Sequence, residues 1–150
     1  LQMQKIQNMH MNERHGADIG YHYAIDCEGN IYEGRDIRFK GEHLSKYNTG
    51  IIGVVLLENL MEPGEGNDFV GKAIKLADSI FGGLTPEVPA RQVEALKKLI
   101  TTLQEFFNIK TLGGHREFPR QQEGEGHFCP GNVGIKLVEQ IRAEIGLNRP

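Results

Sequence analysis

Hydrophobic positions recur with a helical period in three segments of the chain, and each of these segments predicts an amphipathic helix. The first covers residues 2–12. The second has Pro89 in its first turn and runs to about residue 107. The third follows Asn132, a candidate N-cap. The inner faces of the second and third helices are expected to comprise Val93, Leu96, Ile100, Leu103 and Phe107, and Val133, Leu137, Ile141 and Ile145, respectively.

Other segments have the patterns of β-strands. Residues 19–26 alternate around aromatic side chains, and residues 31–35 return after the turn residues 27–30, which predicts a β-hairpin. Residues 51–57 are almost continuously apolar and β-branched, so they predict a strand that is buried on both faces. Gly53 inside that strand predicts that another group approaches its backbone closely.

The order of these elements favours one fold class. A further short strand is expected over residues 109–112 and a short helix within residues 69–81. Because strands and helices alternate along the chain, we predict an α/β fold with a central mixed β-sheet flanked by helices. The length of 150 residues suits a single domain that spans residues 1–150.

Composition and charge exclude several classes of protein. The net charge of −3 and the isoelectric point near 6.1 give no reason to expect binding to nucleic acid. No apolar run approaches the roughly 20 residues of a membrane-spanning helix. Two cysteines can form at most one disulfide, so the chain is not a disulfide-stabilised scaffold.

The candidate chemistry lies around a polar loop, residues 119–126. His115 precedes this loop and Cys129 follows it. Imidazole nitrogen and thiolate sulfur are the ligand types that zinc favours, and a loop between them can bring both to one ion. These residues alone also fit a hydrogen-bonded histidine and an inert, buried cysteine, so both interpretations stay open.

A set of short motifs extends this picture along the chain. They occupy residues 6–11, 18–23, 29–35, 41–43, 47–48, 52–54, 114–117 and 129–131. In this order they resemble the zinc-dependent N-acetylmuramoyl-L-alanine amidases of the phage-lysozyme and peptidoglycan-recognition-protein type. The resemblance covers nearly the whole chain apart from roughly residues 61–88, and it implies a mixed sheet with a groove over one edge.

The resemblance also implies roles for individual residues. In the family a histidine of an N-terminal strand and the residues that match His115 and Cys129 hold the zinc ion. The tyrosine that matches Tyr21 lies beside the metal. Two positions before the third ligand the family commonly has lysine or threonine, and here that position is His127, which as imidazolium stabilises negative charge or as imidazole shuttles a proton.

Several features depart from the family pattern. The chain begins within its first predicted helix, without an initiator methionine or a visible signal peptide, so the strand with the first zinc histidine is expected upstream of Leu1. With only His115 and Cys129, the chain as printed is expected to bind zinc weakly. Residues 61–88 and the loop 119–126 are both expected to be longer than in other members.

The groove-lining loop, residues 36–50, supplies the candidates for substrate contact, namely His43, Tyr47 and Asn48. Arg35 either joins them or anchors the hairpin by pairing with a carboxylate. Plain structural roles also stay open for Tyr21, as a strand aromatic, and for His127, as an exposed loop residue. His22 points to the opposite strand face from Tyr21, which predicts a packed, hydrogen-bonded histidine.

Three functions follow. The first is a zinc hydrolase that cleaves the amide bond between N-acetylmuramic acid and L-alanine of peptidoglycan. The second is a peptidoglycan-binding recognition module with an incomplete metal site. The third is a secreted antibacterial amidase, like an endolysin or a toxin, that an inhibitor or immunity protein restrains. All three place the protein outside the cytoplasm, either secreted, periplasmic or cell-wall associated, with peptidoglycan or muropeptide as its partner.

Overall fold

The computed structural model describes residues 2–58, 60–62, 65, 87–121 and 128–150. The chain divides into two compact units. Unit 1 comprises Leu1–Glu58 and Pro89–Phe106, and unit 2 comprises Asn59–Val88 and Phe107–Pro150. The short helix expected within residues 69–81 lies outside the described residues. The prediction of a single domain over residues 1–150 stays a prediction.

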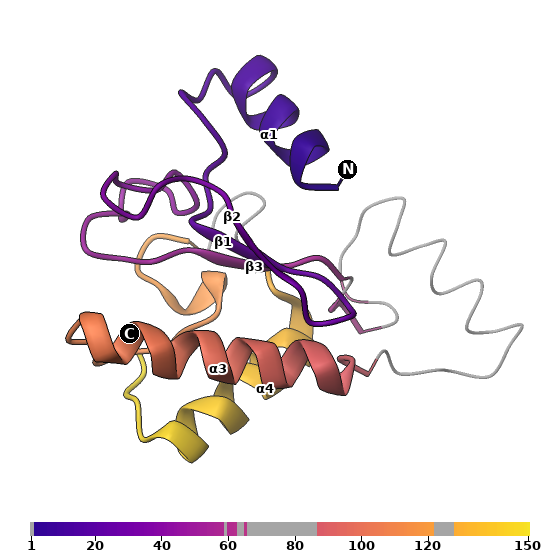
Figure 1. The fold of residues 1–150 in the computed structure, drawn as a ribbon, viewed down its shortest axis with the longest axis vertical. Helices are drawn as coiled ribbons and strands as arrows, with labels where there is room; N and C mark the ends of the chain where they lie inside the picture. The colour runs from indigo at the N-terminus through magenta and orange to yellow at the C-terminus, as the bar shows by residue number, and fades with distance from the viewer. Residues whose placement is uncertain (1, 59, 63–64, 66–86, 122–127) are drawn as a thin grey trace, which may run out of the picture. The chain divides into compact units, whose positions relative to one another are not determined.

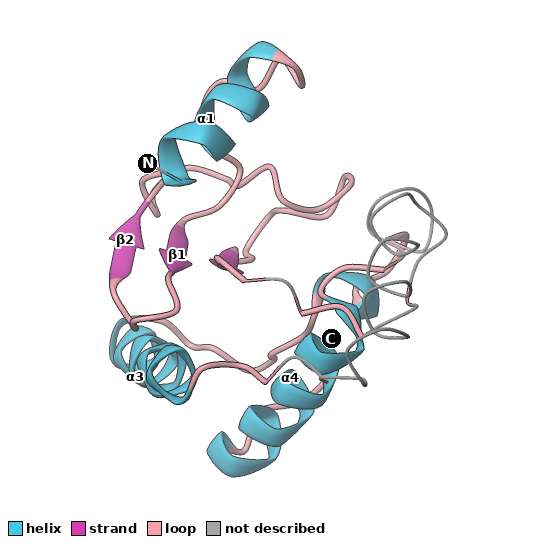
Figure 2. Ribbon diagram, turned by 90° about the vertical axis from the view of Figure 1, so that its right-hand side faces the viewer, coloured by secondary structure: helices cyan, strands magenta, loops and turns pink. Residues whose placement is uncertain are grey.

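Unit 1 contains a three-stranded sheet of β1 (Tyr23–Ile25), β2 (Ile31–Glu33) and β3 (Val54–Leu56). The strand order is β2-β1-β3, in which β2 pairs antiparallel and β3 pairs parallel with β1. Helix α1 (Gln2–Asn12) lies on one side of the sheet and helix α3 (Ala90–Phe106) lies on the other (Figure 1). Figure 2, turned by 90°, shows the same placement of α1 and α3 on opposite sides of the strands. The predicted class, a mixed sheet flanked by helices, is therefore confirmed.

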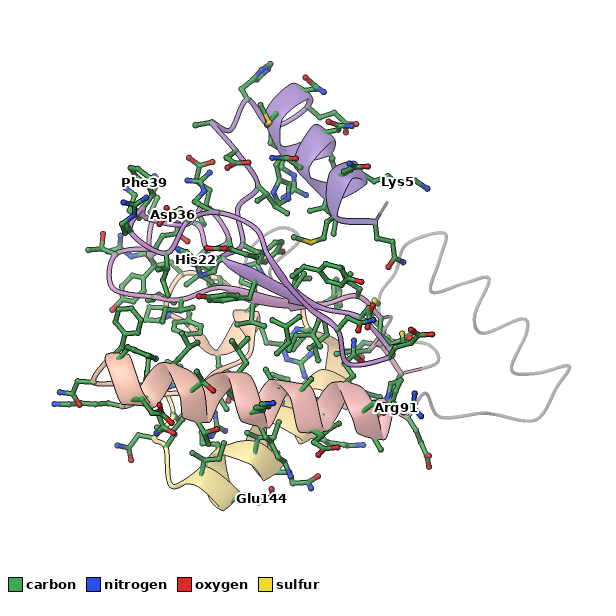
Figure 3. All side chains as sticks on the ribbon, viewed as in Figure 1. Lys5, His22, Asp36, Phe39, Arg91 and Glu144 are labelled. Atoms are coloured by element: carbon green, nitrogen blue, oxygen red, sulfur yellow. The ribbon has the colours of Figure 1, made fainter. Side chains whose placement is uncertain are left out.

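The predicted hairpin is confirmed, and one carboxylate organises its turn. Asp26 accepts hydrogen bonds from the backbone amides of Glu28 at 3.0 Å and Asn30 at 2.8 Å. Gly29 has a φ of +87°, a conformation that strongly favours glycine, and the carbonyl of Arg91 lies where a β-carbon would stand. Arg91 marks the start of α3 in Figure 3, so the turn packs directly on the beginning of that helix.

Helix α3 buries most of its predicted face. Leu96, Ile100 and Leu103 are buried, together with Ala95 and Leu99. The assignment of two residues to this face is wrong. Val93 is only half-buried, and Phe107 lies beyond the end of the helix and is 43% exposed. The predicted stripe was therefore too long at its C-terminal end, because the helix ends before the last apolar residue can turn inward.

A substitution tests which face of α3 is buried. Leu103→Ala is expected to lower the free energy of unfolding by roughly 2–5 kcal/mol, because it removes buried methyl groups and leaves a cavity. The matched control is Phe106→Ala on the same helix, where the side chain is 75% exposed and the change is expected to stay within about 0.5 kcal/mol. Urea melts measure both values, and equal losses for the two variants would contradict this assignment of the faces.

The strand predicted over residues 51–57 is shorter and less buried than expected. β3 is an edge strand of the described sheet, and its three residues are half-buried, so the prediction of burial on both faces is wrong. The close approach predicted at Gly53 is confirmed. A β-carbon there would lie 2.5 Å from Nδ1 of the His43 ring, so only glycine leaves room for the imidazole.

Unit 2 contains the 3₁₀ helix η1 (His115–Glu117) and helix α4 (Gly131–Ile145). The strand predicted over residues 109–112 is reduced to a single parallel bridge between Thr111 and Asn148. Asn132 does not cap α4 as predicted. Its side chain accepts from Arg116 at 2.7 Å, and the carboxylate of Glu65 instead receives the Asn132 backbone N–H at 2.7 Å.

Candidate functional site

The structure brings the backbones of His115 and Cys129 together within unit 2. The backbone N–H of Arg116, the next residue after His115, donates to the carbonyl of Cys129 at 3.0 Å. His115 is half-buried, whereas Cys129 is exposed. The interpretation of Cys129 as a buried, inert thiol is therefore wrong. Cys129 accepts this backbone hydrogen bond, and His115 is the neighbour of its donor.

A buried ion-pair network holds the short helix η1 that carries His115. Glu117 is 4% exposed in its side chain and accepts from the Gly114 amide at 2.9 Å. It also pairs with Arg142 of α4 at 3.0 Å and with Arg149 at 3.0 Å. Burial raises the pKa of the Glu117 carboxyl, but the bonds from Arg142 and Gly114 outweigh burial and leave the pKa below its usual range.

This pKa shift predicts a pH-dependent effect of Glu117→Gln. At pH 7 the variant is expected to unfold with a free energy roughly 1.5–3 kcal/mol lower than the parent chain, because charged hydrogen bonds to Arg142 are lost. A depressed pKa in the folded state stabilises the protein above the unfolded-state pKa, and this stabilisation disappears as the pH falls through the folded-state pKa. The difference between the two proteins should therefore shrink below about pH 4.5. Urea melts across a pH series measure it, and a constant difference would contradict the assignment.

A second network anchors the backbone beside Cys129. Arg116 pairs with Glu65 at 2.9 Å and donates to Asn132 at 2.7 Å, so it links η1 to the start of α4. Gly131 has a φ of +86°, and the carbonyl of Leu60 occupies the place of a β-carbon there. Both segments that carry the candidate ligands are thus held by specific partners.

One further side chain contacts the candidate ligand ring. Nε2 of His115 lies 3.1 Å from Oε1 of Gln121, which is 2% exposed. The amide nitrogen of Gln121 in turn donates to the carbonyl of Pro119 at 3.0 Å. His127, the predicted acid–base residue, lies outside the described residues.

The donor set fits zinc. Imidazole and thiolate are ligand types that zinc prefers over the oxygen donors that magnesium and calcium select, and an exposed thiol is accessible to an ion from solvent. Within the described part of the chain, no group of three or more histidine, cysteine, aspartate or glutamate side chains gathers closely enough to hold a metal. A catalytic zinc site uses three protein ligands, so His115 and Cys129 stay candidates for two of them.

Tyr21, the predicted catalytic tyrosine, lies between two histidines of unit 1. Its ring centroid is 5.7 Å from that of His10 and 6.0 Å from that of His43. The same two histidine rings contact the backbone of the preceding residue, Gly20. The Gly20 amide donates to Nδ1 of His10 at 2.8 Å, and the Gly20 carbonyl lies 3.2 Å from Nδ1 of His43. Tyr21 thus follows a residue whose backbone N–H and C=O both lie within hydrogen-bond distance of a histidine ring.

His22 is a packed, hydrogen-bonded residue, as predicted. Its Nδ1 accepts from the Gly53 amide at 2.9 Å, and its Nε2 lies 3.0 Å from the carbonyl of Phe39. Figure 3 shows His22 at the sheet and Phe39 in the loop that follows β2. Both ring nitrogens thus serve to tie that loop to the sheet.

The residues proposed for substrate contact differ in how the structure uses them. Asn48 accepts from the amides of His43 at 3.1 Å and Leu44 at 2.8 Å, so it shapes the loop, whereas Tyr47 is 47% exposed. Arg35 is 7% exposed and donates to the carbonyls of Ile19 at 2.8 Å, Lys40 at 2.8 Å and Asp18 at 3.1 Å. It also pairs with Glu42 at 2.9 Å. These contacts match the alternative in which Arg35 anchors the hairpin by pairing with a carboxylate.

Sequence reasoning missed His10 and Gln121. His10, near the end of α1, is 6% exposed and accepts a hydrogen bond from the Gly20 amide. Gln121 was one member of a polar loop whose neighbours are also polar. Helical spacing places His10 in line with Ile6 and could have indicated its burial. No local signal marks Gln121, because its partners are set by the fold of the loop.

Comparison with known proteins gives consistent results. Residues 2–132 match the N-acetylmuramoyl-L-alanine amidase family, Amidase_2. Peptidoglycan-recognition protein SC2 of Drosophila melanogaster is 43% identical over 58 residues, which are 39% of this chain and 32% of that protein. N-acetylmuramoyl-L-alanine amidase LysC from Clostridium intestinale URNW superposes with a TM-score of 0.71 and 25% identity over 99% of this chain and 78% of that one.

A third relative was solved with a ligand. A point mutant of Drosophila PGRP-LB, in complex with tracheal cytotoxin, superposes with a TM-score of 0.64 and 25% identity, over 98% of this chain and 70% of that one.

The match to protein SC2 spans about a third of the length of that protein. Within the described residues, no helix is long and apolar enough to cross a membrane.

Proposed function

Because the chain belongs to the N-acetylmuramoyl-L-alanine amidase family, we propose that it hydrolyses the amide bond between N-acetylmuramic acid and L-alanine of peptidoglycan with the help of a zinc ion. The family predicted from the sequence motifs is thereby confirmed, and its members are generally zinc-dependent. The observation that carries the proposal is the backbone hydrogen bond from Arg116 to Cys129. It brings the chain segment that carries the His115 imidazole next to the segment that carries the Cys129 thiol.

In this proposal His115 and Cys129 hold the metal, with Cys129 as thiolate. When bound, zinc activates a water molecule and polarises the carbonyl of the substrate. Tyr21 donates its hydroxyl hydrogen to the oxyanion that develops on the attacked carbonyl, as the family resemblance implies. The role proposed for His127 is to stabilise negative charge or to carry a proton to the leaving amine. His43 and Tyr47 are proposed to contact the muropeptide, in a loop that Asn48 shapes.

A second candidate function is recognition without catalysis. The similar protein SC2 of Drosophila melanogaster is named a peptidoglycan-recognition protein. Recognition needs the loops that contact the substrate but no bond-breaking step. Both functions require peptidoglycan or a muropeptide as the partner and a location outside the cytoplasm. An inhibitor or immunity protein is a further partner only if the amidase acts as a toxin.

Metal removal distinguishes the two candidates. Zinc-loaded protein is expected to release new L-alanine amino termini from purified cell-wall sacculi, whereas protein treated with a chelator should release none. Binding to sacculi should survive chelation, because loop contacts to the substrate exist before the transition state.

Amino-terminal labelling measures the hydrolysis, and co-sedimentation with sacculi measures the binding. Zinc that is added back should restore release of amino termini. Zinc-loaded protein that co-sediments with sacculi and releases no amino termini would favour the recognition function. Loss of co-sedimentation on chelation would show that the metal itself holds the substrate.

A further inference from the structure

We propose that Gln121 is a positioning residue for the metal site, because its buried carboxamide fixes His115 as the tautomer with the proton on Nε2 and the lone pair on Nδ1. Nδ1 is then the nitrogen that His115 offers to the metal. This inference rests on the proposed zinc-binding role of His115 and adds the residue that orients and prepares its ring.

The first step is the orientation of the carboxamide. The carbonyl of Pro119 can only accept a hydrogen bond, and it lies 3.0 Å from the Gln121 amide nitrogen. The –NH₂ end of Gln121 must therefore face Pro119, which leaves Oε1 toward His115. With the side chain 2% exposed, solvent cannot stand in for these partners, so a flipped amide would set two oxygens against each other.

The second step is the tautomer of the imidazole. Oε1 of an amide has no hydrogen, so at 3.1 Å it accepts from Nε2 of His115, which must carry the proton. A neutral imidazole with its proton on Nε2 has its lone pair on Nδ1. A metal ligand needs such a lone pair at a fixed direction, and the bond to Gln121 restricts rotation of the ring about its Cβ–Cγ bond.

The third step concerns where the positioning group comes from. Gln121 lies six residues after His115, in the loop that connects the two candidate ligands. The backbone of His115 is already held by the Glu117 network, and Gln121 adds control of the ring itself. Gln121 is therefore part of the proposed site, although it is not one of the two candidate ligands.

Two substitutions separate positioning from mere filling of a buried space. Gln121→Leu keeps a similar side-chain volume but removes the acceptor. Gln121→Glu keeps an oxygen acceptor for His115 and loses the donation to the carbonyl of Pro119. The chain offers a matched control in Gln92, which is also buried and also donates to a backbone carbonyl, that of Ile25, at 2.8 Å. Gln92→Leu removes a comparable polar contact from α3.

Two measurements are needed, both at pH 8. Long-range ¹⁵N–¹H correlation spectra of metal-free protein report which nitrogen of His115 carries the proton. Competition with a chromophoric chelator reports the Kd for zinc. We expect the parent chain and Gln121→Glu to show the Nε2–H form, and Gln121→Leu to show a mixture of tautomers and a zinc Kd about 10–100-fold weaker. Gln92→Leu should match the parent chain in both.

An unchanged tautomer and an unchanged zinc Kd in Gln121→Leu would overturn the inference. If Gln121→Leu does not fold, Gln121→Glu decides, and an Nδ1–H form of His115 in that folded variant overturns it equally. His115→Ala tests the premise separately. Zinc binding that survives His115→Ala overturns the proposed metal role of His115 and with it this inference. Binding that is lost in His115→Ala but unaffected in Gln121→Leu overturns the inference alone.

Discussion

Cys129→Ser is expected to lower both zinc affinity and amidase turnover by at least about 100-fold, more than the loss typical of groups that only orient a ligand. A serine hydroxyl is a far weaker ligand than a thiolate and does not ionise near neutral pH. The exposed position of Cys129 means that the exchange of sulfur for oxygen leaves no buried cavity. The loss should therefore appear in metal content and turnover, with little change in the free energy of unfolding.

The other cysteine provides the control. Cys27 donates to Glu58 at 2.8 Å in unit 1, and a serine there can keep that hydrogen bond. Cys27→Ser is expected to bind zinc and to cleave peptidoglycan like the parent chain. Metal analysis after gel filtration, with amino-terminal labelling of digested sacculi, measures both variants. Full zinc content in Cys129→Ser would remove Cys129 from the metal site.

Tyr21→Phe is expected to reduce kcat by about 10²–10³-fold and to leave KM nearly unchanged. The proposed hydroxyl acts on charge that exists only in the transition state, so its removal costs turnover and not ground-state binding. The phenylalanine ring keeps the packing between His10 and His43, so the fold around Gly20 should be retained.

A second tyrosine gives the matched comparison. Tyr32 in β2 is 42% exposed, and its hydroxyl donates to Asp26 at 2.8 Å. Tyr32→Phe removes one hydroxyl from the hairpin and is expected to leave kcat unchanged. Steady-state kinetics on soluble muropeptides measures both. Equal kcat values for Tyr21→Phe and the parent chain would assign Tyr21 to packing, the alternative that the strand pattern left open.

The two candidate ligands depend on different kinds of support. His115 lies on a short helix that Glu117 ties to α4, and its ring meets a buried amide. The backbone at Cys129 is fixed through Arg116, Glu65 and Asn132. Residues whose own positions are locked in this way hold a metal with less reorganisation than residues on a bare loop.

Local pattern was sufficient for the three long helices that the structure describes and for the hairpin of this protein. A helical period specified α1, α3 and α4, because a face of apolar side chains at that spacing can be buried only by a helix. Turn residues specified the hairpin, since Asp26 and Gly29 satisfy its backbone through neighbours in sequence. The ligand types His115 and Cys129 were visible for the same reason, because their chemistry belongs to single residues.

Tertiary structure decided what depends on partners that are distant in sequence. The amide of Asn132 finds its acceptor in Glu65, 67 residues away, which no capping pattern could indicate. Arg35 became an anchor because four acceptors from two separate segments surround its guanidinium. The bond between Gln121 and His115 exists only because the fold brings two residues that are six positions apart into contact and buries Gln121. A side chain's burial and its hydrogen-bond partner are properties of the folded neighbourhood, so the sequence by itself determined which groups are present and the fold determined their roles.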